Sequence, residues 1–313
     1  MQAVDVHNFR KTYRVFRKTV EAVRGVSFSV PAGQLVGFVG PNGAGKSTTL
    51  KSILGFLQPS AGQLRVYGQS AGSESALRHI GFMPEHPAFP DTLTGAEWVD
   101  YAHRLHTGHR PPAAHVARLM ESVGLAHAAQ RLIRGYSKGM LQRLGLAQAL
   151  VAEPDILILD EPMSGLDPLG RVVFKDILQQ YHRAGHTIFF TSHILDDVEN
   201  LCSRIIMIDR GMVAVDEQTH VLLDTASDRK VLHFTADESL AQLLVAEGRA
   251  LSVNASGVYE LAGLEAREAS ELVSRLVASG AVIRELRRER LTLEDFFVQL
   301  VTRRGEVVHA PAD

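Results

Sequence analysis

Alternating apolar and polar positions open the chain and predict antiparallel strands between residues 3 and 38. The clearest alternation is Val-Ser-Phe-Ser-Val at residues 26–30, which has the period of two expected of a strand with one buried face. Proline and glycine mark turns, and a Pro-Ala-Gly sequence at residues 31–33 precedes an apolar run at residues 35–39. We therefore expect antiparallel strands that lead into a buried strand.

Short apolar runs alternate with helical periodicity from residue 40 onward. Parallel strands need such helical crossovers between them, so the alternation indicates an α/β fold. The expected strands lie at residues 63–67, 79–83, 155–160, 187–191 and 204–209, and the expected helices at residues 46–57, 168–184 and 195–202.

Helical spacing dominates residues 94–152 and interrupts this alternation. The stretch opens with Thr94 and Glu97, which have the spacing of a capping box at a helix N-terminus. We expect an inserted helical subdomain between the strand near residue 83 and the strand near residue 155.

Residues 221–313 carry none of the phosphate-binding motifs described below, and their pattern predicts a separate small domain. The expected order is β-α-β-β-α-β, a ferredoxin-like α+β arrangement. Thr292 and Asp295 then cap a last helix that we expect to reach about residue 303. The expected elements are strand 229–235, helix 237–247, strands 250–254 and 257–261, helix 265–279 and strand 281–288. Two domains follow, at residues 1–220 and 221–313.

The composition is that of an ordinary globular protein. Of its 313 residues, 45% are hydrophobic and 22% are charged, which excludes disordered, collagen-like and coiled-coil chains. Its 33 Lys and Arg residues against 35 Asp and Glu residues give a net charge of −2 at pH 7. A chain without excess positive charge has no general electrostatic attraction to nucleic acid, so we expect no nucleic-acid partner.

Three features predict a cytoplasmic protein. No apolar stretch reaches the roughly 18 residues that a membrane-spanning helix needs. Residues 1–7 lack the basic and then apolar pattern of a secretory signal. The single cysteine, Cys202, has no partner for an intramolecular disulfide, which suits a reducing compartment.

A glycine-rich loop lies between an expected strand and an expected helix. Residues 40–47 fit the pattern G-x-x-x-x-G-K-[ST] in the context that a phosphate-binding loop requires. In such a loop, backbone N–H groups and the helix N-terminus hold phosphate oxygens, the lysine reaches the β and γ phosphates, and the serine binds Mg²⁺. The candidate ATP-binding residues here are Gly40, Pro41, Asn42, Gly43, Ala44, Gly45, Lys46, Ser47 and Thr48.

Two carboxylates follow the apolar run at residues 156–159. Acidic residues at a strand end are commonly only solvated, but behind a phosphate-binding loop they favour a catalytic pair. Asp160 is the candidate Mg²⁺ ligand, and Glu161, which points elsewhere, is the candidate base that polarises an attacking water.

The segment Tyr-Ser-Lys-Gly-Met-Leu-Gln-Arg-Leu at residues 136–144, called the signature segment below, distinguishes this chain from other nucleotide enzymes. Here the sequence resembles the ATP-binding subunits of ABC transporters, whose signature reads L-S-G-G-Q. The resemblance covers residues 1–220: residues 164–167 are similar to the family's D-loop, residues 191–193 to its switch-histidine segment, and Tyr13 to the aromatic residue that stacks on adenine.

The resemblance implies a P-loop ABC ATPase domain with an antiparallel β subdomain. In that family two subunits enclose two ATP molecules, each held by the phosphate-binding loop of one subunit and by the signature of the other. Ser137, Gly139 and Asp167 are thereby ATP-binding candidates, and Glu161 and His193 are the catalytic candidates.

The resemblance also implies partners. They are a transmembrane permease subunit and, for a homodimer or heterodimer, a second ABC ATPase, with the chain held at the inner face of the cell membrane through the permease. Residues 291–297 resemble the tails of bacterial exporter subunits, which implies export.

Three residues depart from the family pattern. Glu85 stands where the family has a glutamine that contacts Mg²⁺, and a carboxylate can still bind that metal. In the signature, Lys138 replaces a glycine and Met140 replaces a glutamine. Since methionine cannot make the hydrogen bonds of glutamine, we expect ATPase activity with altered affinity.

Other interpretations of the chain and of single residues compete with these. A soluble ABC-type ATPase clamp acting on ribosomes or DNA usually has two cassettes or a long coiled-coil insertion, and this sequence has neither. A P-loop kinase or GTPase would leave the signature without a purpose. For Tyr13, the alternative to stacking on adenine is packing alone, as is common for a tyrosine in an amphipathic strand. His103, His106 and His109 suggest a metal site, although Gly108 argues that their helix has ended.

Overall fold

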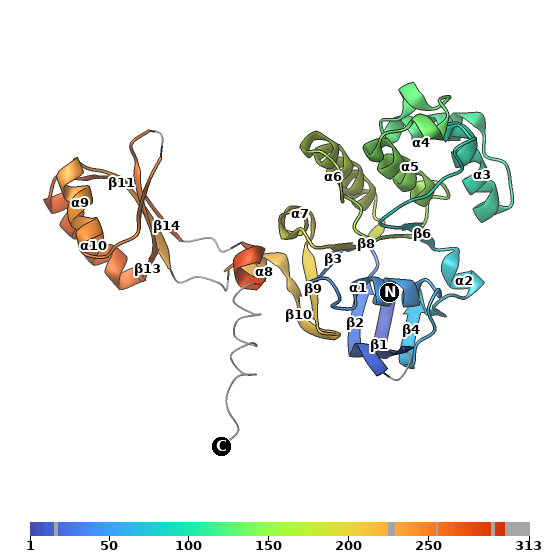
Figure 1. Cartoon of the computed structure of the whole chain (residues 1–313), viewed down its shortest axis with the longest axis horizontal. Helices are drawn as coiled ribbons and strands as arrows, with labels where there is room; N and C mark the ends of the chain where they lie inside the picture. Colours follow the sequence, from blue (N-terminus) through green and yellow to red (C-terminus); the bar gives the residue numbers. More distant parts are fainter. Residues whose placement is uncertain (16–17, 225–228, 255, 289–291, 298–313) are drawn as a thin grey trace, which may run out of the picture. The chain divides into compact units, whose positions relative to one another are not determined.

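The computed structural model describes residues 1–15, 18–224, 229–254, 256–288 and 292–297. It divides into two compact units, Met1–Thr219 and His220–Asp313, which Figure 1 shows in blue to yellow and in orange to red. None of the helices within the described ranges is long and apolar enough to cross a membrane.

The first unit begins with a four-stranded sheet in the order β2-β1-β4-β5. Strands β1 and β2 pair antiparallel along their whole length, from Gln2 opposite Pro31 to Val15 opposite Lys18, as the alternation of the sequence predicts. The strands are β1 (Gln2–Val15), β2 (Lys18–Pro31), β4 (Ala61–Val66) and β5 (Gln69–Ser70).

The central sheet has six strands in the order β10-β9-β3-β8-β7-β6. Strands β9, β3, β8, β7 and β6 are parallel, and β10 is antiparallel to β9. The strands are β3 (Leu35–Val39), β6 (Ile80–Met83), β7 (Ile156–Leu159), β8 (Thr187–Ser192), β9 (Arg204–Asp209) and β10 (Met212–Gln218).

Helices connect the parallel strands, and every residue of β3, β7 and β8 is buried. Strands buried on both faces have continuous apolar sequences, which explains their apolar runs. The predicted α/β fold of this unit is confirmed. The connecting helices are α1 (Lys46–Ile53), α6 (Pro168–Arg183) and α7 (Leu195–Leu201), and the short helix α2 (Glu74–Leu77) precedes β6.

The expected helical subdomain consists of three helices between β6 and β7 (Figure 1). Thr94 and Glu97 form the predicted capping box: Glu97 N donates to Thr94 Oγ1 at 3.2 Å, and Thr94 N donates to Glu97 Oε2 at 2.8 Å. The helices are α3 (Gly95–Thr107), α4 (Ala113–Ser122) and α5 (Lys138–Leu150), with the 3-10 turns η1 (Ala126–Ala128) and η2 (Ile133–Gly135).

Several details differ from the sequence-based expectations, among them the short strand β5 and the short helix α2, which were not expected. Helix α1 ends at Ile53 and not at residue 57, because Gly55 adopts a φ of +78° and Phe56 N closes back onto Lys51 O at 2.8 Å. A glycine in this conformation is the usual helix terminator. Strand β10 was not expected, since its sequence carries little apolar alternation, and its pairing with β9 holds it in place.

The second unit has its own sheet, in the antiparallel order β12-β13-β11-β14. Its core includes Leu232, Phe234, Leu244, Leu272 and Leu276. Residues 293–297 are helical, and the rest of the helix expected there lies outside the described residues. The elements are α8 (Thr219–Asp224), β11 (Lys230–Thr235), α9 (Glu238–Ala246), β12 (Leu251–Val253), β13 (Tyr259–Leu264), α10 (Ala266–Ala278) and β14 (Val282–Arg288).

Candidate functional site

The glycine-rich loop connects the end of β3 to the start of α1. A Cβ atom on Gly40 would lie 2.2 Å from the carbonyl oxygen of Ile208, and one on Gly45, whose φ is +110°, would lie 2.9 Å from the carbonyl oxygen of Ala22. Only glycine fits both positions. The loop therefore wraps closely enough for its backbone N–H groups, at the N-terminus of α1, to face an anion.

A cavity of about 370 Å³ lies against this loop. It gathers segments that are far apart in the sequence, because the carboxyl ends of β3, β7 and β8 are neighbours in the parallel sheet. The residues lining it are Ala22, Pro41, Asn42, Gly43, Gly45, Lys46, Ser47, Thr48, Glu85, Glu161 and His193.

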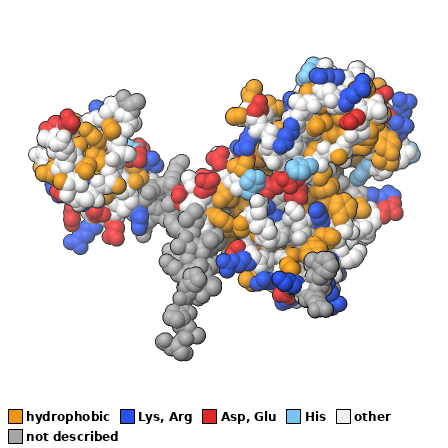
Figure 2. Space-filling model, in the orientation of Figure 1, with side chains coloured by type: hydrophobic (Ala, Val, Ile, Leu, Met, Phe, Trp, Pro, Cys, Tyr) orange, Lys and Arg blue, Asp and Glu red, His pale blue; other side chains and the backbone are white. Residues whose placement is uncertain are grey.

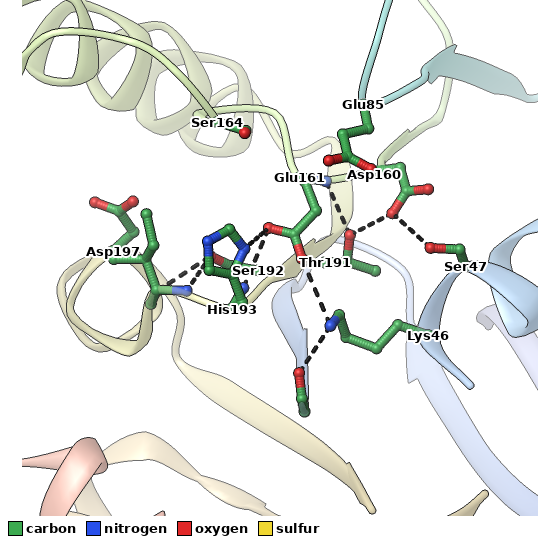
Figure 3. Close-up of polar contacts among 12 residues, drawn as sticks. Lys46, Ser47, Glu85, Asp160, Glu161, Ser164, Thr191, Ser192, His193 and Asp197 are labelled. Carbon is green, nitrogen blue, oxygen red and sulfur yellow. Dashed lines mark hydrogen bonds and ion pairs between the residues drawn. The ribbon is translucent and has the colours of Figure 1, made fainter. Parts of the chain in front are cut away.

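Asp160 directly follows β7 and lies beside Ser47 (Figure 3). Its Oδ1 accepts a hydrogen bond from Thr191 Oγ1 at 2.7 Å and a longer one from Ser47 Oγ at 3.4 Å. The carboxylate of Asp160 and the hydroxyl of Ser47 are oxygen donors of the kind that Mg²⁺ prefers, so these residues fit the metal that the sequence implies. Glu85 brings a further carboxylate to the same cavity.

Glu161 points away from Asp160 because its backbone adopts a φ of +48°, which is rare for a residue with a side chain. Its Oε2 accepts hydrogen bonds from His193 N at 3.2 Å and from the His193 ring Nδ1 at 2.7 Å. Its Oε1 lies 3.6 Å from Lys46 Nζ, which donates to Gly40 O at 2.7 Å. Glu161 is 8% exposed, and its carboxylate, the candidate base, lies between a lysine and a histidine.

Thr191 links the two carboxylate residues, and the sequence gave its side chain no separate role. Its buried hydroxyl donates to Asp160 Oδ1 and accepts from Glu161 N at 2.9 Å. One side chain thus holds the carboxylate of Asp160 and, through the N–H of Glu161, the unusual backbone of that residue. The only signal in the sequence is its place at the end of an expected strand, two residues before His193.

Replacing Thr191 with valine is expected to lower kcat for ATP hydrolysis about tenfold or more, because Asp160 loses its donor and Glu161 loses its anchor. Leaving buried polar groups unpaired costs about 1–3 kcal/mol of stability. Phosphate release and thermal unfolding measure the two effects. Thr187→Val is the control, since Thr187 is buried on the same strand and accepts from Gly33 N at 2.9 Å. A wild-type kcat in Thr191→Val would contradict the assigned role.

The remaining candidates lie outside the lining of this cavity. Ser137 caps α5 and accepts from Met140 N at 3.3 Å, and Asp167 caps α6 and accepts from Gly170 N at 2.7 Å. Gly139 lies in the first turn of α5. Gly40 and Ala44 contribute to the loop but do not line the cavity.

Tyr13 also lies away from the cavity lining. It pairs with Val20 across the β1–β2 hairpin, and Lys11 Nζ stands 5.3 Å from the centre of its ring. The histidines of α3 have local partners: His103 Nδ1 is 3.0 Å from His109 O. Within the described ranges, no group of three or more His, Cys, Asp or Glu side chains could hold a metal ion.

Known proteins with similar sequences identify the family. Residues 23–164 match the family described as ABC transporter. An uncharacterized ABC transporter ATP-binding protein of Synechocystis sp. is 36% identical over 309 residues, which cover 96% of this chain and 85% of that protein. The chain belongs to the ABC transporter ATP-binding proteins. The resemblance inferred from the signature segment is therefore confirmed.

Other ABC proteins match to a similar extent. The linearmycin resistance ATP-binding protein LnrL of Bacillus subtilis is 32% identical over 311 residues, covering 96% of this chain and 98% of that protein. A solved ATP-binding subunit of an ABC transporter is 27% identical, with a TM-score of 0.63 and coverage of 71% of this chain and 92% of that one. A dimeric cassette bound to ADP and Pi has a TM-score of 0.65 at 23% identity, covering 69% of this chain and 98% of that one, and shows the same fold.

As an ABC ATP-binding protein, this chain binds ATP and hydrolyses it as the ATPase subunit of a transporter. The cavity at the glycine-rich loop contains the groups this reaction needs: backbone N–H groups that can bind phosphate at a helix N-terminus, a lysine, and a carboxylate beside a histidine.

Proposed function

We propose that two copies of this chain, or this chain and a homologue, close around two ATP–Mg²⁺ molecules and thereby drive a separate transmembrane permease in export. The observation that carries the proposal is a divided site. The cavity contains Lys46, Glu161 and His193, whereas the signature residues Ser137 and Gly139 lie outside it. Two subunits facing each other would complete each site with the signature of the partner.

The electrostatics support a shared nucleotide. ATP carries about four negative charges, and one lysine with one Mg²⁺ leaves part of that charge unneutralised. Helix α5 has 13 residues, and Ser137 and Lys138 at its N-terminus are exposed. Helix N-termini attract phosphate. The N-terminal turn of α5 in one subunit would thus offer Ser137, Lys138 and the Gly139 N–H to the ATP of the other.

The residues of the cavity have separate tasks in hydrolysis. Ser47 and Asp160 would hold Mg²⁺, with Glu85 as a further ligand, and bound Mg²⁺ neutralises charge on the phosphate oxygens. Lys46 contacts the β and γ phosphates. Glu161 accepts a hydrogen bond from the attacking water, and His193 orients Glu161 and the γ phosphate. The products are ADP and phosphate, and their release opens the dimer.

An apolar groove of about 450 Å³ between β6 and the helical subdomain is the proposed permease contact. Phe56 and Leu105 on its walls are 64% and 67% exposed. Figure 2 shows hydrophobic side chains gathered on this face, below the three helices of the subdomain. Exposed apolar patches of this kind mark interaction sites, and the occupant we propose is a short apolar segment on the cytoplasmic side of the permease.

Replacing Phe56 and Leu105 together with serine is expected to lower permease recovery at least about tenfold and leave the ATPase rate of the isolated chain unchanged, because both side chains lie outside the nucleotide cavity. Tagged chain purified from detergent extract, with its bound polytopic membrane protein quantified, provides the measurement. Leu243→Ser, which changes a side chain 51% exposed in the second unit, is the control. Equal recovery from all three chains would contradict the docking site.

The direction of transport rests on relatives. Besides LnrL, a fluoroquinolones export ATP-binding protein of Mycobacterium tuberculosis is 36% identical over 229 residues, and the daunorubicin/doxorubicin resistance ATP-binding protein DrrA of Streptomyces peucetius is 37% identical over 222 residues. We place the chain at the cytoplasmic face of the membrane, bound to its permease. Purification with ribosomes or DNA in place of a membrane protein would instead favour a soluble ABC clamp.

A further inference from the structure

Helix α5 contacts two loops of the nucleotide cavity. Its first turn packs on the D-loop, residues 164–167: Lys138 Nζ lies 2.1 Å from where a Cβ on Gly165 would stand, and Leu166 Cδ2 lies 3.6 Å from where a Cβ on Gly139 would stand. Farther along the helix, Gly145 packs on Pro87, which belongs to residues 83–87, called the Glu85 segment here. A Cβ on Gly145 would lie 3.2 Å from Pro87 Cβ. One helix therefore touches both loops.

Gln142 of helix α5 joins the helix to the Glu85 segment and to the D-loop by hydrogen bonds. Its Nε2 donates to Glu85 O at 3.1 Å and to Ser164 O at 3.3 Å. Both partners are carbonyl oxygens, which can only accept, so the amide must present its NH₂ group to them. Gln142 is 2% exposed, and its Oε1 has no hydrogen-bond partner among the residues that the structure describes, so the amide is held by its two donated bonds alone.

Each contact of Gln142 leads to the catalytic carboxylates. Ser164 N donates to Glu161 O at 3.0 Å, which closes the turn after Glu161. Figure 3 shows Ser164 and Glu85 on the two strand-end loops that flank Glu161 and Asp160. At the N-terminus of the same helix, Ser137 is exposed and Gly139 is partly exposed, and both face a second subunit in the function proposed above.

We propose that Gln142 is a positioning residue that makes the signature helix α5, the D-loop and the Glu85 segment move as one body. ATP bound at Lys46 and Glu161 would then set the orientation in which Ser137 meets the ATP of the partner subunit. Without the amide, the carbonyl oxygens of Glu85 and Ser164 lose the Gln142 donor, and helix α5, the D-loop and the Glu85 segment can shift independently. The inference rests on the proposed two-subunit site.

The test compares dimer formation in the full chain carrying Glu161→Gln, with and without Gln142→Met. Methionine has nearly the same length and no donor. ATP and Mg²⁺ are titrated, and the dimer is measured by sedimentation. We expect Gln142→Met to raise the ATP concentration for half-maximal dimer at least about tenfold, with ATP affinity of the monomer changed less than about twofold. In the chain with Glu161 intact, the Hill coefficient for ATP should fall toward 1.

Gln148→Met is the matched control, because Gln148 lies on the same helix and accepts from Trp98 Nε1 at 3.0 Å, away from both loops. If the Glu161→Gln chain alone never dimerises, the proposed function fails. Two results would overturn the positioning role once the Glu161→Gln chain dimerises. One is that adding Gln142→Met leaves the ATP concentration for half-maximal dimer unchanged. The other is that Gln142→Met weakens ATP binding to the monomer as much as it weakens dimer formation.

A second variant and a second measurement guard against misfolding. Gln142→Asn keeps the donor on a side chain shorter by one methylene and should give an intermediate titration. If neither variant folds, hydrogen exchange on the unsubstituted chain decides: residues 83–87, 137–143 and 161–167 should gain protection at one ATP concentration. Separate midpoints for these segments would overturn the inference.

Discussion

Glutamine at position 161 is expected to lower kcat for ATP hydrolysis by about 10²–10⁴-fold, the range lost with a general base, while ATP binding is retained. The amide keeps the shape of Glu161 and a carbonyl oxygen for the His193 donors at 2.7 and 3.2 Å. It cannot polarise a water as a carboxylate does. Loss of the negative charge 3.6 Å from Lys46 Nζ also frees that lysine for phosphate.

The measurements are steady-state phosphate release and size-exclusion chromatography with ATP and Mg²⁺. Since hydrolysis is slowed and binding is not, an ATP-bound dimer should accumulate. Glu74→Gln is the control: Glu74 lies on α2 and pairs with exposed Arg78 at 2.7 Å, outside the cavity lining, so its rate should match the unsubstituted chain. A slow variant that stays strictly monomeric would count against the shared nucleotide site.

Alanine at position 46 is expected to abolish turnover and to weaken ATP binding by about 30- to 1000-fold, the equivalent of about 2–4 kcal/mol. Lys46 is 6% exposed and its ammonium already lies between Gly40 O and Glu161. Removing it leaves the Glu161 carboxylate without its cation inside the cavity, which repels phosphate.

Equilibrium binding of a fluorescent ATP analogue separates this effect from loss of catalysis. Lys51→Ala is the matched control, because Lys51 lies in the last turn of the same helix and is exposed. Wild-type affinity in the Lys46→Ala chain would show that the glycine-rich loop alone holds the phosphates and would remove Lys46 from the site.

One proposal concerns contacts between two subunits, and the other concerns contacts within one subunit. In the proposed function, residues lining the cavity act on the chain's own ATP, whereas the N-terminal turn of α5 acts on the ATP of the partner. Gln142 connects these two surfaces through Glu85 O and Ser164 O. A transporter needs such a connection, because a permease can be moved only by differences between the states that ATP and ADP stabilise.

Candidate site residues that lie close together in the sequence could be predicted from the sequence alone. The glycine-rich loop, the Asp160–Glu161 pair and the signature segment each depend on local spacing, and local spacing also marked the capping box at Thr94. The positions of most strands and helices followed for the same reason. The sequence did not predict the short elements β5, α2 and α8, and at the end of α1 and at β10 a glycine and a neighbouring strand decided the outcome.

By itself, then, the sequence determined the family, the α/β class and the candidate side chains for holding ATP and activating water. Only the tertiary structure decided how these segments meet. Thr191 reaches Asp160 because β8 lies beside β7, and Gln142 reaches Glu85 and Ser164 because α5 crosses both loops. A side chain and its partner 22 to 57 residues away leave no mark in local spacing, since strand order and helix packing alone bring them within hydrogen-bonding distance.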